Sequence, residues 1–152
     1  MRAFLTGVVT AIVILVLAGL ATAWFGWLPA GANTKYLPME RWAAKRTLAA
    51  NLAREEPQPP YPYGPVTDAV LVAGAKGYIA NCAVCHGSAG SDESNLAKGL
   101  YIKPPQFPKH GVDDDPAGET YWKIENGIRF TGMPAFKPTL SEQQMWQIAY
   151  FL

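Results

Sequence analysis

Cysteine and charge are both scarce in this sequence. The 152 residues include only two cysteines, which excludes the disulfide framework of a small secreted domain. Charged residues make up 16% of the chain, against about 25% in an average protein, and the formal net charge is +1. A nucleic-acid-binding protein would need a strong basic excess, so no nucleic-acid partner is expected. The length leaves room for one small domain with attachments.

Hydrophobic residues are abundant, at 49% of the chain, and a long run of them lies near the N-terminus. Residues 3–28 carry no charge. A helix of that length measures roughly 39 Å, more than the hydrocarbon core of a bilayer, which is about 30 Å thick. Trp24 and Trp27 stand near the end of the run, where aromatic rings favour the membrane interface. The sequence therefore predicts a single transmembrane anchor over residues 1–30.

A cleaved signal peptide is the alternative for this segment. Ala21-Thr22-Ala23 fits the small-residue pattern of a signal cleavage site. The apolar core of a signal peptide, however, has about 7–15 residues, and this run continues through Trp24 and Phe25. Retention as an anchor is therefore the favoured interpretation, and cleavage stays open.

Residues 31–56 connect the predicted anchor to the rest of the chain, and a helix is predicted over residues 39–56. Trp42, Ala49 and Leu52 recur at spacings of seven and three, and no helix breaker interrupts the segment. Three interpretations stay open: a solvated spacer, a helix lying on anionic headgroups, or a docking handle for a partner subunit.

A proline cluster precedes the C-terminal domain. Residues 57–65 include five prolines, which no helix or central strand tolerates. A proline-rich segment is stiff and extended, so residues 57–66 are predicted to be a linker and residues 67–152 a separate domain.

Helical signals dominate this domain. The first predicted helix covers about residues 67–81. The second begins at Asp115, with Pro116 suited to the first helical position. The third begins at Ser141, which forms a capping-box pattern with Gln144 three residues later.

No stretch of the domain shows the alternation of a strand, and residues 87–114 are predicted to be mostly loop. The expected fold class is therefore all-α. Three short helices and long loops give a thin core for independent folding, so a non-protein group is expected to fill the middle.

The motif that carries chemistry is Cys82-Ala83-Val84-Cys85-His86, directly after the first of these helices. Cys-x-x-Cys-His is the attachment motif of c-type haem. Two thiols three residues apart on a helical turn reach the two vinyl groups of one porphyrin, and the following histidine presents its imidazole to the iron. The sequence therefore predicts one covalently attached haem c, with Cys82 and Cys85 in thioether bonds and His86 as an axial iron ligand.

A zinc site and a redox-active dithiol are the alternatives for this motif. A zinc ion needs about four ligands, and beyond the motif only His110 or a carboxylate is available. A thioredoxin-like dithiol is typical of a βαβ context, which the pattern lacks. Both are disfavoured relative to haem, and the dithiol would leave Cys82 and Cys85 free.

Met133 is the candidate for the second axial ligand. It lies in Gly132-Met133-Pro134, where the flanking residues favour a tight loop that brings the thioether toward the iron. Met39 precedes the linker, and Met145 lies on the apolar face of the last predicted helix. His110 is the rival ligand, in a sequence that indicates an exposed loop.

Together these motifs resemble those of the small class I cytochrome c domains of bacteria. The resemblance covers residues 67–152. It rests on the Cys82-to-His86 motif, the preceding helix with Gly74, the Gly-Met-Pro at 132–134 and the aromatic last helix. It implies a small all-α fold around one haem, in which the first and last helices cross.

The resemblance implies further details. Gly74 would allow close approach at the helix crossing. Its expected packing partners are Tyr78, Trp146 and Tyr150. In such domains a proline carbonyl often accepts the proton of the proximal imidazole, which fixes the ring and tunes the iron. Pro104 and Pro105 are the candidates for that carbonyl.

Ligation by histidine and methionine raises the reduction potential and suits reversible one-electron transfer. The leading hypothesis is a membrane-tethered electron carrier, not an enzyme, that exchanges electrons with membrane or periplasmic oxidoreductases. The first alternative is a fixed haem subunit of a larger membrane redox complex. A less favoured one is an open-site peroxidase or gas-binding protein, in which Met133 would be displaceable.

Location follows from the same resemblance, which implies that haem is attached outside the cytoplasm. The domain is therefore expected on the periplasmic side of the bacterial cytoplasmic membrane. The flanking charges conflict with this expectation, because Arg2 precedes the anchor and four cations follow it: Lys35, Arg41, Lys45 and Arg46. The positive-inside rule alone would place the domain in the cytoplasm, and the attachment chemistry overrules it.

Overall fold

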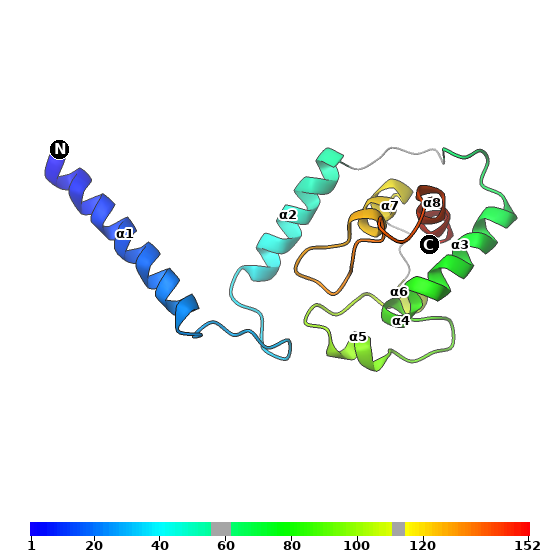
Figure 1. The fold of residues 1–152 in the computed structure, drawn as a ribbon, viewed down its shortest axis with the longest axis horizontal. Helices are drawn as coiled ribbons and strands as arrows, with labels where there is room; N and C mark the ends of the chain where they lie inside the picture. Colours follow the sequence, from blue (N-terminus) through cyan, green and yellow to red (C-terminus); the bar gives the residue numbers. More distant parts are fainter. Residues whose placement is uncertain (56–61, 111–114) are drawn as a thin grey trace. The chain divides into compact units, whose positions relative to one another are not determined.

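The chain is built from helices, as Figure 1 shows. The structure is a computed structural model that describes residues 1–55, 62–110 and 115–152, with His110 described in its backbone alone. No strand occurs in these ranges, in agreement with the predicted all-α class. The chain divides into two compact units, Met1–Thr34 and Lys35–Leu152, and each is described by itself.

The first unit is dominated by helix α1, Arg2–Trp24. None of its side chains is buried, and the helix is long and apolar enough to cross a membrane. Gly26 follows it at φ +69°, a left-handed conformation that commonly ends helices, so the helix stops before Pro29. This unit is compatible with a single-pass anchor.

Helix α2, Glu40–Glu55, belongs to the second unit and lies within the predicted helix. Leu52 is buried, and α2 contacts helix α7, Ala117–Asn126. Trp42 is 62% exposed and Ala49 is also exposed. The apolar spacing in the sequence is therefore not one buried face, and only Leu52 of the three residues faces the interior.

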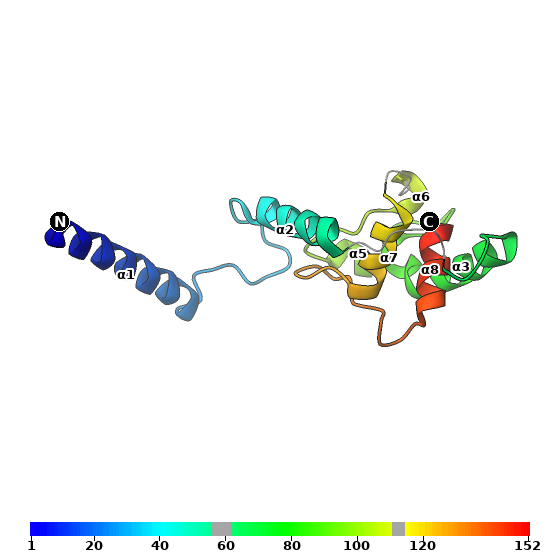
Figure 2. The same cartoon turned by 90° about the horizontal axis from the view of Figure 1, so that it is seen from above.

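The core lies where helix α3, Asp68–Asn81, crosses helix α8, Glu142–Phe151, with α7 packed against α8 (Figures 1 and 2). At Gly74 a Cβ atom would collide with the backbone of Gln147 and the Cβ of Phe151. Only glycine permits this approach, as the resemblance implies. The buried core consists of side chains from these three helices: Tyr78, Tyr121, Ile124, Met145, Trp146, Ile148 and Ala149.

The aromatic residues of this core make more specific contacts than the sequence indicates. Tyr78 lies against Phe151 at 5.7 Å between ring centroids. Trp146 stacks on Tyr121 at 4.3 Å and an interplanar angle of 18°, with Tyr150 5.9 Å from Trp146. Trp146 therefore ties α8 to α7, a contact that the sequence does not reveal.

The predicted helix ends are close to the observed ones. Ser141 is the N-cap of α8, and both hydrogen bonds of its capping box with Gln144 are formed. Helix α7 begins at Ala117, one residue later than the predicted position, so Pro116 is its N-cap rather than its first helical residue. Gly127 follows α7 at φ +65°.

The region predicted to be mostly loop contains short helices. Ser94 accepts a hydrogen bond from the Ala97 N–H at 3.1 Å and donates one to the Val84 carbonyl at 2.5 Å. Such short helices lack the repeating pattern that reveals longer ones. The elements in this region are α5 (Asn95–Gly99) and α6 (Phe107–His110), and the short helix α4 (Ala83–His86) directly precedes it. Half of the predicted proline linker, residues 57–61, and residues 111–114 lie outside the described ranges.

Candidate haem site

The two cysteines of the motif lie on one turn of backbone. Cys82 joins the end of α3 to the start of α4, and Cys85 lies inside α4. Both are free thiols and half-buried. Residues three apart on a helix have Cβ atoms about 5–6 Å apart on the same face. Burial raises the pKa of the Cys82 thiol to about 11, with a smaller contribution from Cys85, so this thiol is protonated near neutral pH.

His86 ends α4 with its imidazole already oriented. Its Nδ1 lies 3.0 Å from the carbonyl oxygen of Pro105, so the proton is on Nδ1 and Nε2 keeps a lone pair. The ring of Phe107 stacks on the imidazole at 4.3 Å and 10°. Burial lowers the pKa of His86, although the hydrogen bond to Pro105 opposes this effect. The side chain is therefore a neutral imidazole, which is the form that binds a metal.

Pro105 and Pro104 lie in residues 100–106, called here the proline loop, and their carbonyls have different partners. The Pro105 carbonyl contacts His86, whereas the Pro104 carbonyl accepts a hydrogen bond from the Gln106 Nε2 at 3.2 Å. Gln106 also donates to the Cys85 carbonyl at 2.9 Å. Gln106 thus joins the proline loop to α4, a role that sequence reasoning missed because no local pattern marks it.

Tyr78 is a second supporting residue that the sequence assigns only to packing. Its hydroxyl donates to the carbonyl of Gly87 at 2.5 Å, which fixes the backbone directly after His86. Burial raises the pKa of Tyr78 to about 12, with a smaller contribution from Cys82. Tyr78 therefore stays protonated and keeps donating this hydrogen bond over the physiological pH range.

Met133 lies in residues 127–136, called here the methionine loop. The Met133 N–H donates to the Thr131 Oγ1 at 3.1 Å, and that hydroxyl donates to the Ile128 carbonyl at 2.7 Å. A Cβ at Gly127 would lie 2.7 Å from the Met133 carbonyl oxygen, and one at Gly132 would meet the side chain of Leu100. The two glycines and Thr131 thus enforce the tight loop that the sequence predicts.

The remaining methionines and His110 differ from Met133 in their surroundings. Met145 is 2% exposed inside the core, and Met39 is 70% exposed on the surface. Met133 is half-buried and packs against the core cluster, as Cys82 does. The side chain of His110 lies outside the described part of the structure.

These donors fit a covalently attached haem c. Two reduced thiols on one turn, a neutral imidazole with one nitrogen already fixed, and a half-buried thioether are the groups that such a haem requires. Within the described residues, no group of three or more His, Cys, Asp and Glu side chains is arranged to hold a metal ion directly.

Individual known proteins give only a partial likeness to this chain. No curated protein matches the chain. Among solved structures, a chain of the reducing HAO-like protein complex of Kuenenia stuttgartiensis is 25% identical, with a TM-score of 0.48. The alignment covers 66% of this chain and 51% of that chain, so this chain spans about half the length of the solved one.

A family model gives the assignment. The model described as "Cytochrome C oxidase, cbb3-type, subunit III" matches residues 69–152, which is more than half of the chain. The matched region contains the Cys-x-x-Cys-His motif, the proline loop and the methionine loop. It is a c-type cytochrome domain, and such a domain implies covalently bound haem c and a role in electron transfer. The chain therefore belongs to the family of cbb3-type cytochrome c oxidase subunit III cytochrome domains.

Proposed function

We infer that the chain is a membrane-anchored carrier of single electrons, with one haem c bound through Cys82 and Cys85 and ligated by His86 and Met133. The observation that carries this proposal is the state of His86. Its Nδ1 is engaged by Pro105 at 3.0 Å, which leaves Nε2 as the ligand atom. The motif occurs once in the sequence, which supports a single haem.

Each residue of the site has a separate task. Cys82 and Cys85 hold the group in place, and the Pro105 carbonyl keeps the imidazole of His86 in one orientation. Met133 offers a soft sulfur donor that favours the reduced iron and raises the potential. When bound, the haem supplies a reversible one-electron couple. With His86 and Met133 as its two ligands, the iron would have no position left for a substrate, which favours electron transfer over catalysis.

The deciding experiment is an optical spectrum of the purified, dithionite-reduced protein with and without carbon monoxide. A c-type spectrum that does not respond to carbon monoxide is expected, because His86 and Met133 would occupy both ligand positions of the iron. A spectrum that shifts would reject the carrier and favour an open-site peroxidase or gas-binding protein.

The role of Met133 can be tested by Met133→Ala. This change should lower the reduction potential and allow carbon monoxide to bind, because the sulfur donor is lost. The matched control is Met39→Ala, since Met39 is 70% exposed and no effect is expected there. An unchanged oxidised spectrum in Met133→Ala would reject Met133 as a ligand.

A second candidate function is a fixed haem subunit in a larger membrane oxidoreductase. The family description, which names a subunit of an oxidase, favours it. A free carrier should migrate alone in mild detergent, whereas a subunit should co-purify with other chains in fixed stoichiometry. Mass analysis of the detergent-extracted protein separates the two.

The periplasmic location is part of the proposal. Helix α1 would keep the cytochrome domain near membrane oxidoreductases and raise its effective concentration there. Protease added to intact spheroplasts should digest the domain. Full protection of the domain, with digestion only after the membrane is opened, would place it in the cytoplasm as the positive-inside rule suggests.

A further inference from the structure

The start of the second unit is bound to the proline loop. The rings of Tyr36 and Tyr101 lie 4.9 Å apart at an angle of 58°. The Tyr36 hydroxyl donates to the Tyr101 carbonyl at 3.1 Å, and the Tyr101 hydroxyl donates to the Glu40 carboxylate at 2.8 Å. Tyr101 is therefore held through both its backbone and its side chain. Tyr36, Glu40 and Tyr101 are called the clasp.

The clasp is fixed by contacts of its own. The Glu40 Oε2 that binds Tyr101 also accepts a hydrogen bond from the Leu37 N–H at 2.9 Å. The guanidinium of Arg41 lies over the Tyr36 ring, 4.9 Å from its centroid. A hydrogen bond to an ionised carboxylate is stronger than one between neutral groups. The clasp can therefore hold Tyr101 firmly although it lies near the surface.

The same loop carries the carbonyl that orients His86. Pro105 follows Tyr101 by four residues, and Gln106 anchors the far end of the loop on α4. Two consecutive prolines have fixed φ angles and restrict the residue before them. Only Ile102 and Lys103 separate Tyr101 from the two prolines, so little of the loop is free to absorb a movement of Tyr101.

We propose that the clasp positions the Pro105 carbonyl, so that the segment leading out of the first unit sets the strength of the His86 Nδ1–H hydrogen bond. Through that bond it sets the potential of the haem iron, and to this extent the proposal rests on the proposed function. Tyr36, Glu40 and Tyr101 are thus positioning residues. A stronger hydrogen bond makes the imidazole more basic and favours the oxidised iron. Loosening the clasp therefore raises the potential.

The test uses the full-length, haem-loaded protein in detergent. Tyr101→Phe and Glu40→Ala each remove the hydrogen bond between the two side chains. Each should change the ratio of oxidised to reduced protein by about threefold at a fixed electrode potential, which is about 28 mV for a one-electron couple. The double variant should shift no further than Glu40→Ala, because both changes remove the same bond. The exchange rate of the His86 ring N–H, followed by NMR, should rise at least threefold.

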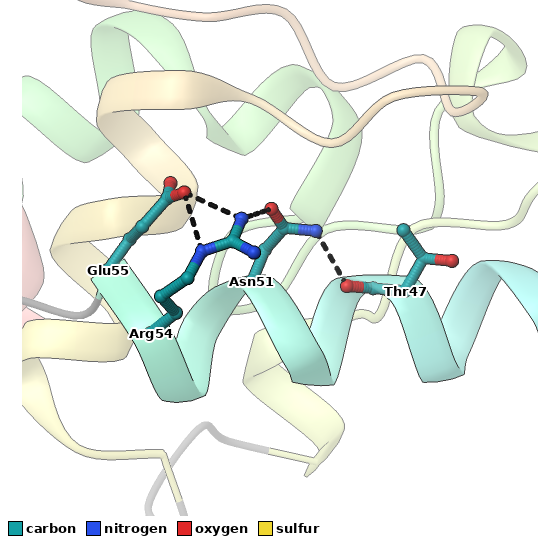
Figure 3. A network of polar contacts seen from close by, with 4 residues as sticks. All are labelled: Thr47, Asn51, Arg54 and Glu55. Carbon is teal, nitrogen blue, oxygen red and sulfur yellow. Dashed lines mark hydrogen bonds and ion pairs between the residues drawn. The ribbon is translucent and has the colours of Figure 1, made fainter.

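The matched control is Glu55→Gln. Glu40→Ala also removes a negative charge, and Glu55→Gln removes one from the same helix without touching the clasp. Glu55 pairs with Arg54 at 2.9 Å, and both side chains are largely exposed. Figure 3 shows that this network continues through Asn51 to Thr47 and includes no residue of the clasp. No change in potential is expected there, and Tyr101→Phe leaves the charge unaltered.

Three results would overturn the proposal. Unchanged potentials in Tyr101→Phe and Glu40→Ala, with a normal haem spectrum, would reject the clasp and leave the proposed function intact. An equal shift in Glu55→Gln would show that charge alone moves the potential. A wild-type protein without covalently bound haem would overturn the clasp and the proposed function together.

Discussion

The methionine loop and the proline loop are held in place by different means. In the methionine loop, the Ile128 N–H donates to the Met133 carbonyl at 3.2 Å, and the Phe136 N–H donates to the Ile124 carbonyl at 3.0 Å. Its hydrogen bonds come from its own residues, the Thr131 hydroxyl included, and from the helix directly before it, and Leu100 of the proline loop lies beside Gly132. Such a loop should respond to changes within it and little to changes elsewhere.

The proline loop depends on side chains from other elements. Gln106 ties its end to α4, and Tyr36 and Glu40 hold Tyr101 from positions 65 and 61 residues away. A loop held in this way should respond to substitutions far along the chain. The difference teaches that the two proposed iron ligands, Met133 and His86, can be perturbed separately, one by local changes and the other by distant ones.

The largest expected effect is that of Gly127→Ala, which places a new side-chain atom against the backbone of the methionine loop. The new Cβ would lie 2.6–2.7 Å from backbone atoms of Met133, Pro134 and Ala135, at φ +65°. We expect the free energy of unfolding to fall by about 2–4 kcal/mol, measured by guanidinium titration. The control is Gly90→Ala, at φ +76° with nothing within 4 Å, which should cost only about 1 kcal/mol. Equal losses of stability in the two variants would mean that the positive φ angle, and not the contact with Met133, causes the loss.

Thr131→Val should have the next largest effect. The change removes the hydrogen bonds of the hydroxyl to the Met133 N–H and the Ile128 carbonyl, at a cost of about 1–2 kcal/mol. Thr139→Val is the control, because that hydroxyl is exposed and bonds only the Phe136 carbonyl. Exchange of the His86 ring N–H should stay unchanged in Thr131→Val. Faster exchange there would contradict the independence of the two loops.

Gln106→Leu tests the proline loop instead, because it removes the amide that joins this loop to α4. Its amide bonds to the Cys85 and Pro104 carbonyls are lost, which should lower the free energy of unfolding by about 1 kcal/mol. Here the ring N–H of His86 should exchange faster, because the Pro105 carbonyl is less well placed. Gln143→Leu, at an exposed position of α8, serves as the control. Unaltered exchange in Gln106→Leu would show that the loop does not need this side chain.

The smallest effect is expected from Lys137→Met. Lys137 pairs with Glu125 at 2.9 Å, but the lysine side chain is 70% exposed, and exposed pairs contribute little. The thermal midpoint should change by an amount equivalent to about 0.5 kcal/mol or less, and added salt should reduce even that. A loss above about 1 kcal/mol, more than an exposed pair contributes, would mean that the ion pair between Lys137 and Glu125 also helps to hold the methionine loop.

The same contrast between local and distant contacts decides which features the sequence could predict. Local features were within reach: the capping box at Ser141 and the Gly-Met-Pro loop both depend on neighbours within a few residues. Gly74 and the helix crossing came from the resemblance to class I cytochromes. The all-α class followed because no strand pattern competes with the helical one.

The side chains that hold the proline loop could not be predicted from the sequence. Gln106 and Tyr36 act on partners that are far away in sequence, and no local pattern records such contacts. Sequence reasoning left Pro104 and Pro105 as equal candidates because the difference is one of register, which only the folded loop defines. The apolar spacing of α2 was misleading for the same reason, since Trp42 is exposed while Leu52 is buried.

The contribution of α8 to the core affects the order of events during synthesis. Four of the seven core residues, Met145, Trp146, Ile148 and Ala149, belong to this helix, and it closes the glycine-lined crossing with α3. A nascent chain that has not yet exposed α8 lacks the helix that packs most extensively against α3 and supplies most of the core. The thiols of Cys82 and Cys85 thus emerge from the ribosome or translocon long before the domain can close. The position of α8 along the chain therefore gives any factor that modifies these thiols an interval in which they are fully accessible.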